Sequence, residues 1–315
     1  LHAIFATHDA RGANQAELWL AFAKRGFGKD AKSTNTAANT DTDPAPDFAS
    51  PRHSNATVKF AAQDEKKQAV PARVYVGQFE ARVSPIADTN PATGPADGTA
   101  ATADTSNLDN VASFTSRTYE FVAHAEGYGH LRFRADLKAG QSRMIMLHFA
   151  TNWASRHKGA VATGEGVRLD ALIDDTENSN WEFSGRPVNV APHPTVTVAL
   201  APGKHKLDRA NVSAYLFPTV GNDEMASATQ NRFTALRQFE LRVCRAGEDS
   251  GNPTCDGTNG AGWESVYRSS ESFFPGDTPR PVAPELLLRG FDFGSQWATH
   301  VQFVVLDNQC TGNTA

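Results

Sequence analysis

From residue 57 onward, apolar and polar residues alternate in short runs, and this period of two predicts β-strands. In the first half of the chain the expected strands are 57–60, 74–79, 118–122, 131–134 and 144–149. In the second half they are 196–200, 212–216, 239–243, 263–267, 285–288 and 300–306. Strands at this spacing, with little helix between them, favour a β-sandwich or a jelly roll. The predicted fold class is therefore mainly β.

One segment near the start of the chain has the periodicity of a helix instead. Residues 13–28 place Leu18, Trp19 and Phe22 on one apolar face, with Asn14 at the N-cap and Gly26 as a left-handed stop. An amphipathic helix must bury its apolar face, and few residues precede this one. We therefore expect the helix to pack on a protein body upstream of Leu1.

Two polar segments interrupt these patterns. Residues 33–55 are rich in Ser, Thr, Asn, Asp and Pro, with Phe48 as their only large apolar residue, so they are interpreted as a linker. Residues 87–110 contain one large apolar residue, Leu108, and are expected to form a flexible insert. The predicted parts are a helical segment at 1–32, the linker at 33–55, a β-sandwich at 56–168 that carries the insert, and a second β domain at 169–315.

The charge balance and the hydropathy argue against two kinds of partner. The chain has 30 Lys and Arg residues against 35 Asp and Glu, for a net charge of −5. Nucleic acid and anionic lipid attract clustered cations, so neither is expected as the main partner. The apolar runs have the length of strands and fall short of the roughly 18 residues of a membrane span, so no span is expected.

The chain has three cysteines, and their spacing bears on its compartment. Cys244 and Cys255 flank a polar loop within a segment that otherwise has the strand pattern. A disulfide that closes this loop would imply an oxidising compartment, whereas two free thiols are the alternative that the spacing leaves open. Cys310 is left without a predicted partner.

Motifs of the common catalytic and nucleotide-binding sites are absent from the sequence. The chain contains no His-Glu-x-x-His, Gly-x-Ser-x-Gly, Gly-x-x-x-x-Gly-Lys-Ser/Thr or Cys-x-x-Cys motif. Its ten histidines are scattered, and no two are spaced so as to share a helical face as metal ligands. No catalytic centre is therefore predicted within this chain.

A polar turn ahead of the second group of strands contains a candidate cation site. The run from Asp174 to Trp181 is dense in Asp, Asn, Thr and Ser, and Asp174, Thr176 and Ser179 offer the oxygen ligands that Ca²⁺ prefers. The alternative is an Asx-rich turn whose side chains accept hydrogen bonds from nearby backbone N–H groups. The spacing does not match an EF-hand.

Aromatic and arginine side chains supply candidate ligand contacts. Trp181, Trp263 and Trp297 are candidates for stacking on sugar rings or docking on a partner, although the core is the commoner place for such residues. Arg232 lies in a segment with the strand pattern and is a candidate for lining a groove for an acidic ligand. A solvated sheet face is the alternative for this arginine.

Three stretches together resemble a family of secreted peptidases. Residues 13–28, with Leu18-Trp19, Phe22-Ala23 and Arg25-Gly26, resemble the last helix of the catalytic domain in bacterial fungalysin-type zinc metallopeptidases. Residues 170–312, with the runs from Asp174 to Trp181 and from Gln230 to Phe239, look like the C-terminal jelly roll of these enzymes. That jelly roll is similar to discoidin-type, galactose-binding-like modules. The middle block, with Val74-Tyr75-Val76-Gly77, resembles a prealbumin-like module.

The resemblance implies a fold and a calcium loop, but it carries over no catalytic residue. It implies a prealbumin-like β-sandwich and then a jelly roll, preceded by a short helical segment. In discoidin-type modules an Asp seven positions before the Trp and a hydroxyl two before it help to hold Ca²⁺, which here implies Asp174 and Ser179. Asp175 stands where those modules have Gly. The zinc-binding His-Glu-x-x-His helix and the downstream Glu ligand are absent, so Zn²⁺ is expected only in an upstream catalytic part.

These observations lead to one leading hypothesis and two alternatives. The chain is expected to be the non-catalytic C-terminal region of a secreted, extracellular metallopeptidase, whose β domains bind glycan, cell surface or protein substrate. In the first alternative it belongs to a cleaved but still active zinc metallopeptidase whose catalytic part is a separate chain. In the second it is an extracellular adhesin or assembly subunit.

Overall fold

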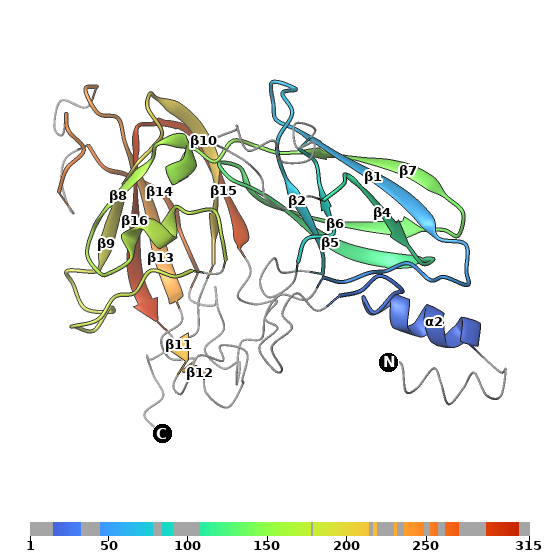
Figure 1. Ribbon diagram of the computed structural model, residues 1–315. Helices are drawn as coiled ribbons and strands as arrows, with labels where there is room; N and C mark the ends of the chain where they lie inside the picture. The colour runs from blue at the N-terminus through green and yellow to red at the C-terminus, as the bar shows by residue number, and fades with distance from the viewer. Residues whose placement is uncertain are drawn as a thin grey trace, which may run out of the picture. The chain divides into compact units, whose positions relative to one another are not determined.

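The computed structural model divides into two compact units, residues 1–151 and 152–315 (Figure 1). It describes residues 15–32, 45–77, 84–90, 108–177, 179–213, 236–248, 253–257, 262–270 and 288–308, together with the backbone of 217–218 and 230–231. Within these residues the protein is mainly β, with a short helix ahead of the strands, as the sequence predicts. In the same part of the chain, no helix has both the length and the apolar character needed to cross a membrane.

Helix α2 (Gln15–Ala23) lies where the sequence predicts it, and the predicted glycine stop, Gly26, follows in the turn after its last residue. Gly26 has a φ of +84°, and the N–H groups of Gly26 and Phe27 donate to the carbonyls of Ala23 and Phe22. This is the hydrogen-bond pattern of a glycine-terminated helix. Asn14, the expected N-cap, lies outside the described residues. The predicted apolar face of Leu18, Trp19 and Phe22 is half-buried.

Residues 45–50, which the sequence places in the linker, pack on the first unit. Phe48 is 8% exposed, and its ring centroid lies 5.9 Å from that of Phe114 and 5.6 Å from that of Tyr119. The Asp47 N–H donates to the Gly26 carbonyl, so the same segment also holds the end of helix α2. Burying one phenyl ring contributes about 2 kcal/mol, which explains how a segment of such polar composition becomes ordered.

The first unit is a β-sandwich of two sheets. Its strands are β1 (Ala56–Gln63), β2 (Arg73–Val76), β3 (Ala87–Asp88), β4 (Val111–Phe114), β5 (Arg117–Ala125), β6 (Gly129–Leu137) and β7 (Ser142–His148). One sheet has the order β4-β1-β7 and the other β3-β2-β5-β6. β1 and β7 are parallel, and the other pairs in the described residues of this unit are antiparallel. Phe60, Phe114 and Phe121 are fully buried in the core that both sheets share.

Both ends of the predicted insert at 87–110 belong to this sandwich. Ala87–Asp88 forms β3 and pairs with β2. The Asp88 N–H donates to the Asp109 carbonyl at 3.1 Å, and the Phe60 N–H donates to the Asn110 carbonyl at 2.8 Å. The two ends of the segment are therefore held against the sheets. Residues 91–107, between them, lie outside the described residues.

The second unit begins at Asn152, ahead of the boundary predicted at residue 169. Its elements are η1 (Arg156–Lys158), β8 (Val161–Gly164), η2 (Leu169–Leu172), β9 (Thr195–Ala199), β10 (His205–Val212), β11 (Phe217–Pro218), β12 (Gln230–Asn231), β13 (Leu236–Cys244), β14 (Glu264–Arg268), β15 (Arg289–Ala298) and β16 (His300–Asn308). Strand β8 pairs with β9, which places the residues around it in this unit.

The described strands of the second unit form two layers. A five-stranded antiparallel sheet has the order β14-β13-β16-β9-β8, while β10 pairs with β15, and β11 with β12. Phe239 of β13 is fully buried, and its ring centroid lies 5.3 Å from that of Phe291 in β15. The β10–β15 pair therefore covers one face of the five-stranded sheet, and the unit is a β-sandwich as predicted. Strand β15 has no counterpart among the predicted strands, and β10 overlaps the strand expected at 212–216 only at Val212. Residues 214–216 and 285–287, on which two predicted strands fall, lie outside the described residues.

Candidate functional site

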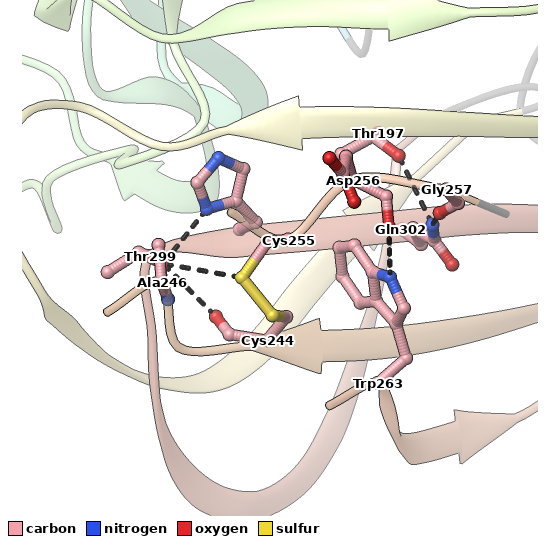
Figure 2. The surroundings of a disulfide bond; sticks show 10 residues. Thr197, Cys244, Ala246, Cys255, Asp256, Gly257, Trp263, Thr299 and Gln302 are labelled. Carbon is pink, nitrogen blue, oxygen red and sulfur yellow. Dashed lines mark hydrogen bonds between the residues drawn. A yellow bond between two sulfur atoms is a disulfide. The ribbon is translucent and has the colours of Figure 1, made fainter. Parts of the chain in front are cut away.

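Two of the three tryptophans predicted as ligand contacts, Trp181 and Trp263, are each held by a backbone carbonyl. Trp181 is half-buried, and its Nε1 donates to the Glu165 carbonyl, just beyond β8, at 2.9 Å. Trp263 is also half-buried, and its Nε1 donates to the Asp256 carbonyl at 3.5 Å, just before β14 (Figure 2). Since β8 and β14 are the opposite outer strands of the five-stranded sheet, the two rings do not form one site. The predicted arginine, Arg232, lies outside the described residues.

The turn predicted to bind calcium is held together by hydrogen bonds to its own side chains. The Asp174 carboxylate accepts hydrogen bonds from the Thr176 N–H at 3.3 Å and from the Ser179 hydroxyl. Asp175 has a φ of +64°, a conformation that Gly adopts more readily, and its buried carboxylate accepts from Asn152 Nδ2 at 2.6 Å. No three His, Cys, Asp or Glu side chains gather as metal ligands in the described part of the chain. The Asx-rich turn accounts for these contacts, and the calcium site stays a prediction.

The third candidate tryptophan, Trp297 of β15, is presented to solvent. Its side chain is 50% exposed, whereas the next residue, Ala298, is fully buried in the core. Lys206 of β10 is its cross-strand neighbour, and Lys204 Nζ lies 5.6 Å from the centroid of the indole ring. We refer to Trp297, Lys204, Lys206 and Glu248 as the Trp297 corner. An exposed indole ring bordered by charged groups offers both an apolar platform and hydrogen-bond donors to a ligand.

An irregularity in the pairing of β10 with β15 turns Trp297 outward. The register of this pair shifts between Leu207 and Arg209 of β10. On one side of the shift, Phe291 and Phe293 pack on the core, and on the other side Ala298 does so. The inward-facing positions of β15 thus change from odd to even numbers along the strand. Trp297 would face the core in a regular strand, and the irregularity points it to solvent instead.

The disulfide predicted between Cys244 and Cys255 is present (Figure 2), and its two Cα atoms lie 5.9 Å apart. It closes the loop that follows β13. Thr299, in the turn between β15 and β16, binds this loop at its base: its hydroxyl accepts from the Ala246 N–H at 2.7 Å and donates to the Cys244 carbonyl at 3.3 Å. The loop is therefore attached to the turn that lies two residues from Trp297.

Two further contacts hold the same loop. Gln302 is fully buried, and its Nε2 donates to the Gly257 carbonyl at 2.6 Å and to Thr197 Oγ1 at 3.3 Å (Figure 2). Glu248, within the loop, forms an ion pair with Lys204 in the turn between β9 and β10. Because Glu248 binds the Lys204 amine, that amine stays close to the Trp297 ring. The corner therefore combines three segments of the chain with one carboxylate and two amines.

Two histidines lie behind the corner. The His205 ring stacks on Trp153 with centroids 3.9 Å apart, and its Nε2 lies 2.9 Å from the Ala201 carbonyl oxygen. These contacts support the turn that carries Lys204. His300 lies beside the β15–β16 turn, and burial lowers the pKa of its imidazole. The surroundings of His300 therefore disfavour its protonated, charged form.

Comparison with known proteins found similarity at the level of structure alone. No protein-family model and no curated protein matches the chain. CpGH89CBM32-5 from Clostridium perfringens, in complex with GalNAc-beta-1,3-galactose, is 20% identical, with a TM-score of 0.27 over 48% of this chain and 87% of that chain. Chitosan-binding module 2 of a Paenibacillus sp. IK-5 chitosanase/glucanase, in complex with chitotriose, is 12% identical, with a TM-score of 0.27 over 50% and 88%. The family 32 CBM of C. perfringens NanJ, in complex with galactose, is 17% identical, with a TM-score of 0.27 over 47% and 82%. TM-scores of this size do not establish a shared fold or ligand.

Proposed function

We propose that the second unit is a glycan-binding module and that the Trp297 corner is its binding surface. The observation that carries the proposal is the exposed indole of Trp297, which stands on the outer face of β15 between charged side chains. A pyranose ring has an apolar face of C–H groups and a rim of hydroxyls. An indole ring can stack on that face while neighbouring charged groups bind the hydroxyls.

Each side chain of the corner has a distinct role in this proposal. Trp297 supplies the platform, and the amines of Lys204 and Lys206 donate hydrogen bonds to hydroxyl or ring oxygens. Glu248 accepts hydrogen bonds from hydroxyls and keeps Lys204 in place through their ion pair. Because Glu248 compensates one of the two amines, the corner is better suited to a neutral sugar than to a strongly acidic one.

Calorimetry with the full chain and Trp297→Ala tests this assignment. Galactose, GalNAc-beta-1,3-galactose and chitotriose form the first panel, and a broader glycan array follows. We expect Trp297→Ala to weaken binding by about tenfold or more, because the platform is lost while the core is untouched. Phe27→Ala is the matched control, since Phe27 lies in the first unit and is 51% exposed. Parent-like affinity in Trp297→Ala, or no binding to any glycan on the array, would contradict the proposal.

We further infer that this binding unit belongs to the non-catalytic accessory region of a secreted, fungalysin-type metallopeptidase. The motif at residues 13–28 supports this inference, since helix α2 forms within it and is followed by the left-handed Gly26. The disulfide supports an extracellular location, because such bonds persist in oxidising compartments. The coding sequence upstream of Leu1 provides the test. A His-Glu-x-x-His motif there would support the inference, and the absence of that motif would contradict it.

The calcium proposal concerns the turn at Asp174, Thr176 and Ser179 and is separate from glycan binding. Titration calorimetry of the full chain with Ca²⁺ is compared with Asp174→Ala. We expect heat of binding from the parent and none from the variant, because the Asp174 carboxylate is the only anionic ligand among these three residues. Absence of heat in both proteins would end the calcium proposal.

A further inference from the structure

The outer face of the sheet β4-β1-β7 in the first unit presents apolar side chains to solvent. Met144 and Met146 of β7 are 61% and 40% exposed, and Val111 of β4 is 37% exposed. The two methionines occupy alternate positions of one strand, so they lie on the same face, whereas Leu147 next to Met146 belongs to the core. Methionine is more often buried, and exposed apolar side chains that gather on one face are typical of a surface that binds a partner.

A shallow hollow on this face adds cations and hydroxyls to the apolar side chains. The residues that line it are Thr57, Lys59, Val111, Ser142, Arg143 and Met144. In the β1–β7 pairing, Thr57 is opposite Ser142, and Lys59 is opposite Met144. All of these residues are exposed. Because neighbouring strands are about 4.8 Å apart, the two cationic groups and the two hydroxyls can reach one anionic group in the hollow.

The two cations of the hollow are not neutralised by the described part of the chain. Within those residues, neither Lys59 nor Arg143 forms an ion pair or a side-chain hydrogen bond. Asp109, two residues ahead of Val111, is exposed, and it lies on the side of Val111 away from Thr57. The hollow is therefore a positively charged part of a chain whose net charge is −5.

An apolar surface beside a positively charged hollow fits an acidic peptide. We propose that this face of the first unit binds an extended acidic peptide whose apolar side chains lie on Met144, Met146 and Val111. A carboxylate of the peptide occupies the hollow, where it accepts charge-assisted hydrogen bonds from Lys59 and Arg143. Methionine has three rotatable side-chain bonds, so the apolar part of the face can adapt to peptides of different shape.

Two other anionic partners fit this face less well. The positions of β1, β4 and β7 that alternate outward contain no Phe, Tyr or Trp, and a sugar ring is usually held by stacking on such a side chain. An anionic membrane is typically bound by clusters of roughly four to eight cations, and the hollow has two. The peptide proposal concerns the first unit and does not rest on glycan binding by the second.

The experiment screens the full chain on an array of octapeptides in which Asp or Glu alternates with Leu, Val or Phe. Each peptide has one partner with Asn or Gln in place of the acids and another with Ser in place of the apolar residues. We expect the parent to bind the acidic apolar peptides at least about tenfold more tightly than either partner, and to bind them more weakly as salt is raised. Equal binding to the acidic and the neutral peptides, or no binding to the array, would overturn the proposal.

Affinities of three variants for the tightest-binding octapeptide locate the site. Lys59→Gln/Arg143→Gln should bind it about tenfold more weakly and lose most of the salt dependence, because the charges that attract the peptide are gone. Met144→Ser/Met146→Ser should also bind about tenfold more weakly, but with the salt dependence of the parent, because apolar contact is lost. Asp109→Asn should bind a few-fold more tightly, since its carboxylate repels the acidic peptide. A purely structural role for these residues would not produce this pattern.

Matched controls lie away from this face. Lys66→Gln removes an exposed cation from the turn after β1, and Val161→Ser removes a 56% exposed apolar side chain from the second unit. Both should bind the peptide as the parent does. Trp297→Ala should keep its peptide affinity, and the variants of the hollow should keep their glycan affinity, so failure of one proposal is distinguishable from failure of the other.

Circular dichroism confirms that each variant is folded. Vesicles of equal parts phosphatidylcholine and phosphatidylserine test the alternative of a membrane partner. Parent-like peptide affinity in the folded Met144→Ser/Met146→Ser variant would refute the site, as would binding of the parent to the vesicles and not to the peptides.

Discussion

At the scale of single residues, the direction in which a side chain points decides whether a ligand can reach it, and residue type alone does not. Trp181, Trp263 and Trp297 are chemically identical, but the first two donate their indole N–H groups to backbone carbonyls and are half-buried. Trp297 is half-exposed because the register shift between β10 and β15 turns it away from the core. The sequence names all three as candidates, but it contains no signal that ranks them.

His300 supports a residue-scale prediction about pH. Burial lowers the pKa of its imidazole below the ordinary value of 6.5. Between the lowered pKa and 6.5, the unfolded chain binds more protons than the folded chain, so the free energy of unfolding rises with pH in that interval. We expect stability to fall on acidification from pH 6.5, and to fall less in His300→Gln.

Urea unfolding of the parent and of His300→Gln, followed by tryptophan fluorescence at several pH values, measures this difference. Gln can still bond to the Thr299 hydroxyl, which lies 2.9 Å from His300 Nδ1, so the comparison isolates the titration. Parallel pH dependence in the two proteins would show that His300 contributes nothing to it.

At the scale of elements, the local alternation of apolar and polar residues predicted the positions of some strands well and of others poorly. Strands β9, β13, β14 and β16 lie close to their predicted positions, because each alternates apolar and polar residues over its own length. Strand β15 was missed: it contains Gly290, Gly294 and Ser295, which have low strand propensity, and its pattern is broken by the register shift. Its strand conformation depends on pairing with β10, which is remote in sequence.

The disulfide loop supports an element-scale prediction about stability. The bond joins residues separated by 11 positions, and closing a loop of this size restricts the unfolded chain. We expect Cys244→Ala/Cys255→Ala to lower the free energy of unfolding of the second unit by about 2–3 kcal/mol. Glycan affinity should fall as well, because Glu248 is in the loop and holds Lys204.

Chemical unfolding and glycan titration of the double variant check both effects. Glu248→Gln serves as the control that keeps the disulfide but weakens the ion pair: it should reduce glycan affinity with little loss of stability, since exposed ion pairs contribute less than about 1 kcal/mol. A double variant as stable as the parent would mean that the bond does not constrain the loop.

At the scale of the whole molecule, the chain consists of two units that each have a core of their own. The core around Phe60 and Phe121 is built from residues of the first unit, and the core around Phe239 from residues of the second. The candidate glycan surface draws on residues of the second unit alone.

This independence leads to a prediction for the isolated second unit. Residues 152–315, expressed alone, should unfold cooperatively and bind glycan with the affinity of the full chain, since the Trp297 corner draws on that unit only. The isolated first unit should bind no glycan. Failure of residues 152–315 to unfold cooperatively, or a large loss of glycan affinity, would show that the unit needs the rest of the chain.

The sequence alone determined the features that depend on neighbouring residues: the mainly β fold class and the helix with its stop at Gly26. It named Cys244 and Cys255 as a candidate pair, and the structure decided between a disulfide and two free thiols. Period-two patterning and glycine termination act over a few residues, so they can be recognised in the chain. Only the tertiary structure decided that Phe48 joins a core, that β10 pairs with β15, and that Trp297 faces solvent. Each of these depends on contacts between segments distant in sequence, where register and burial are set by the partner as much as by the residue itself.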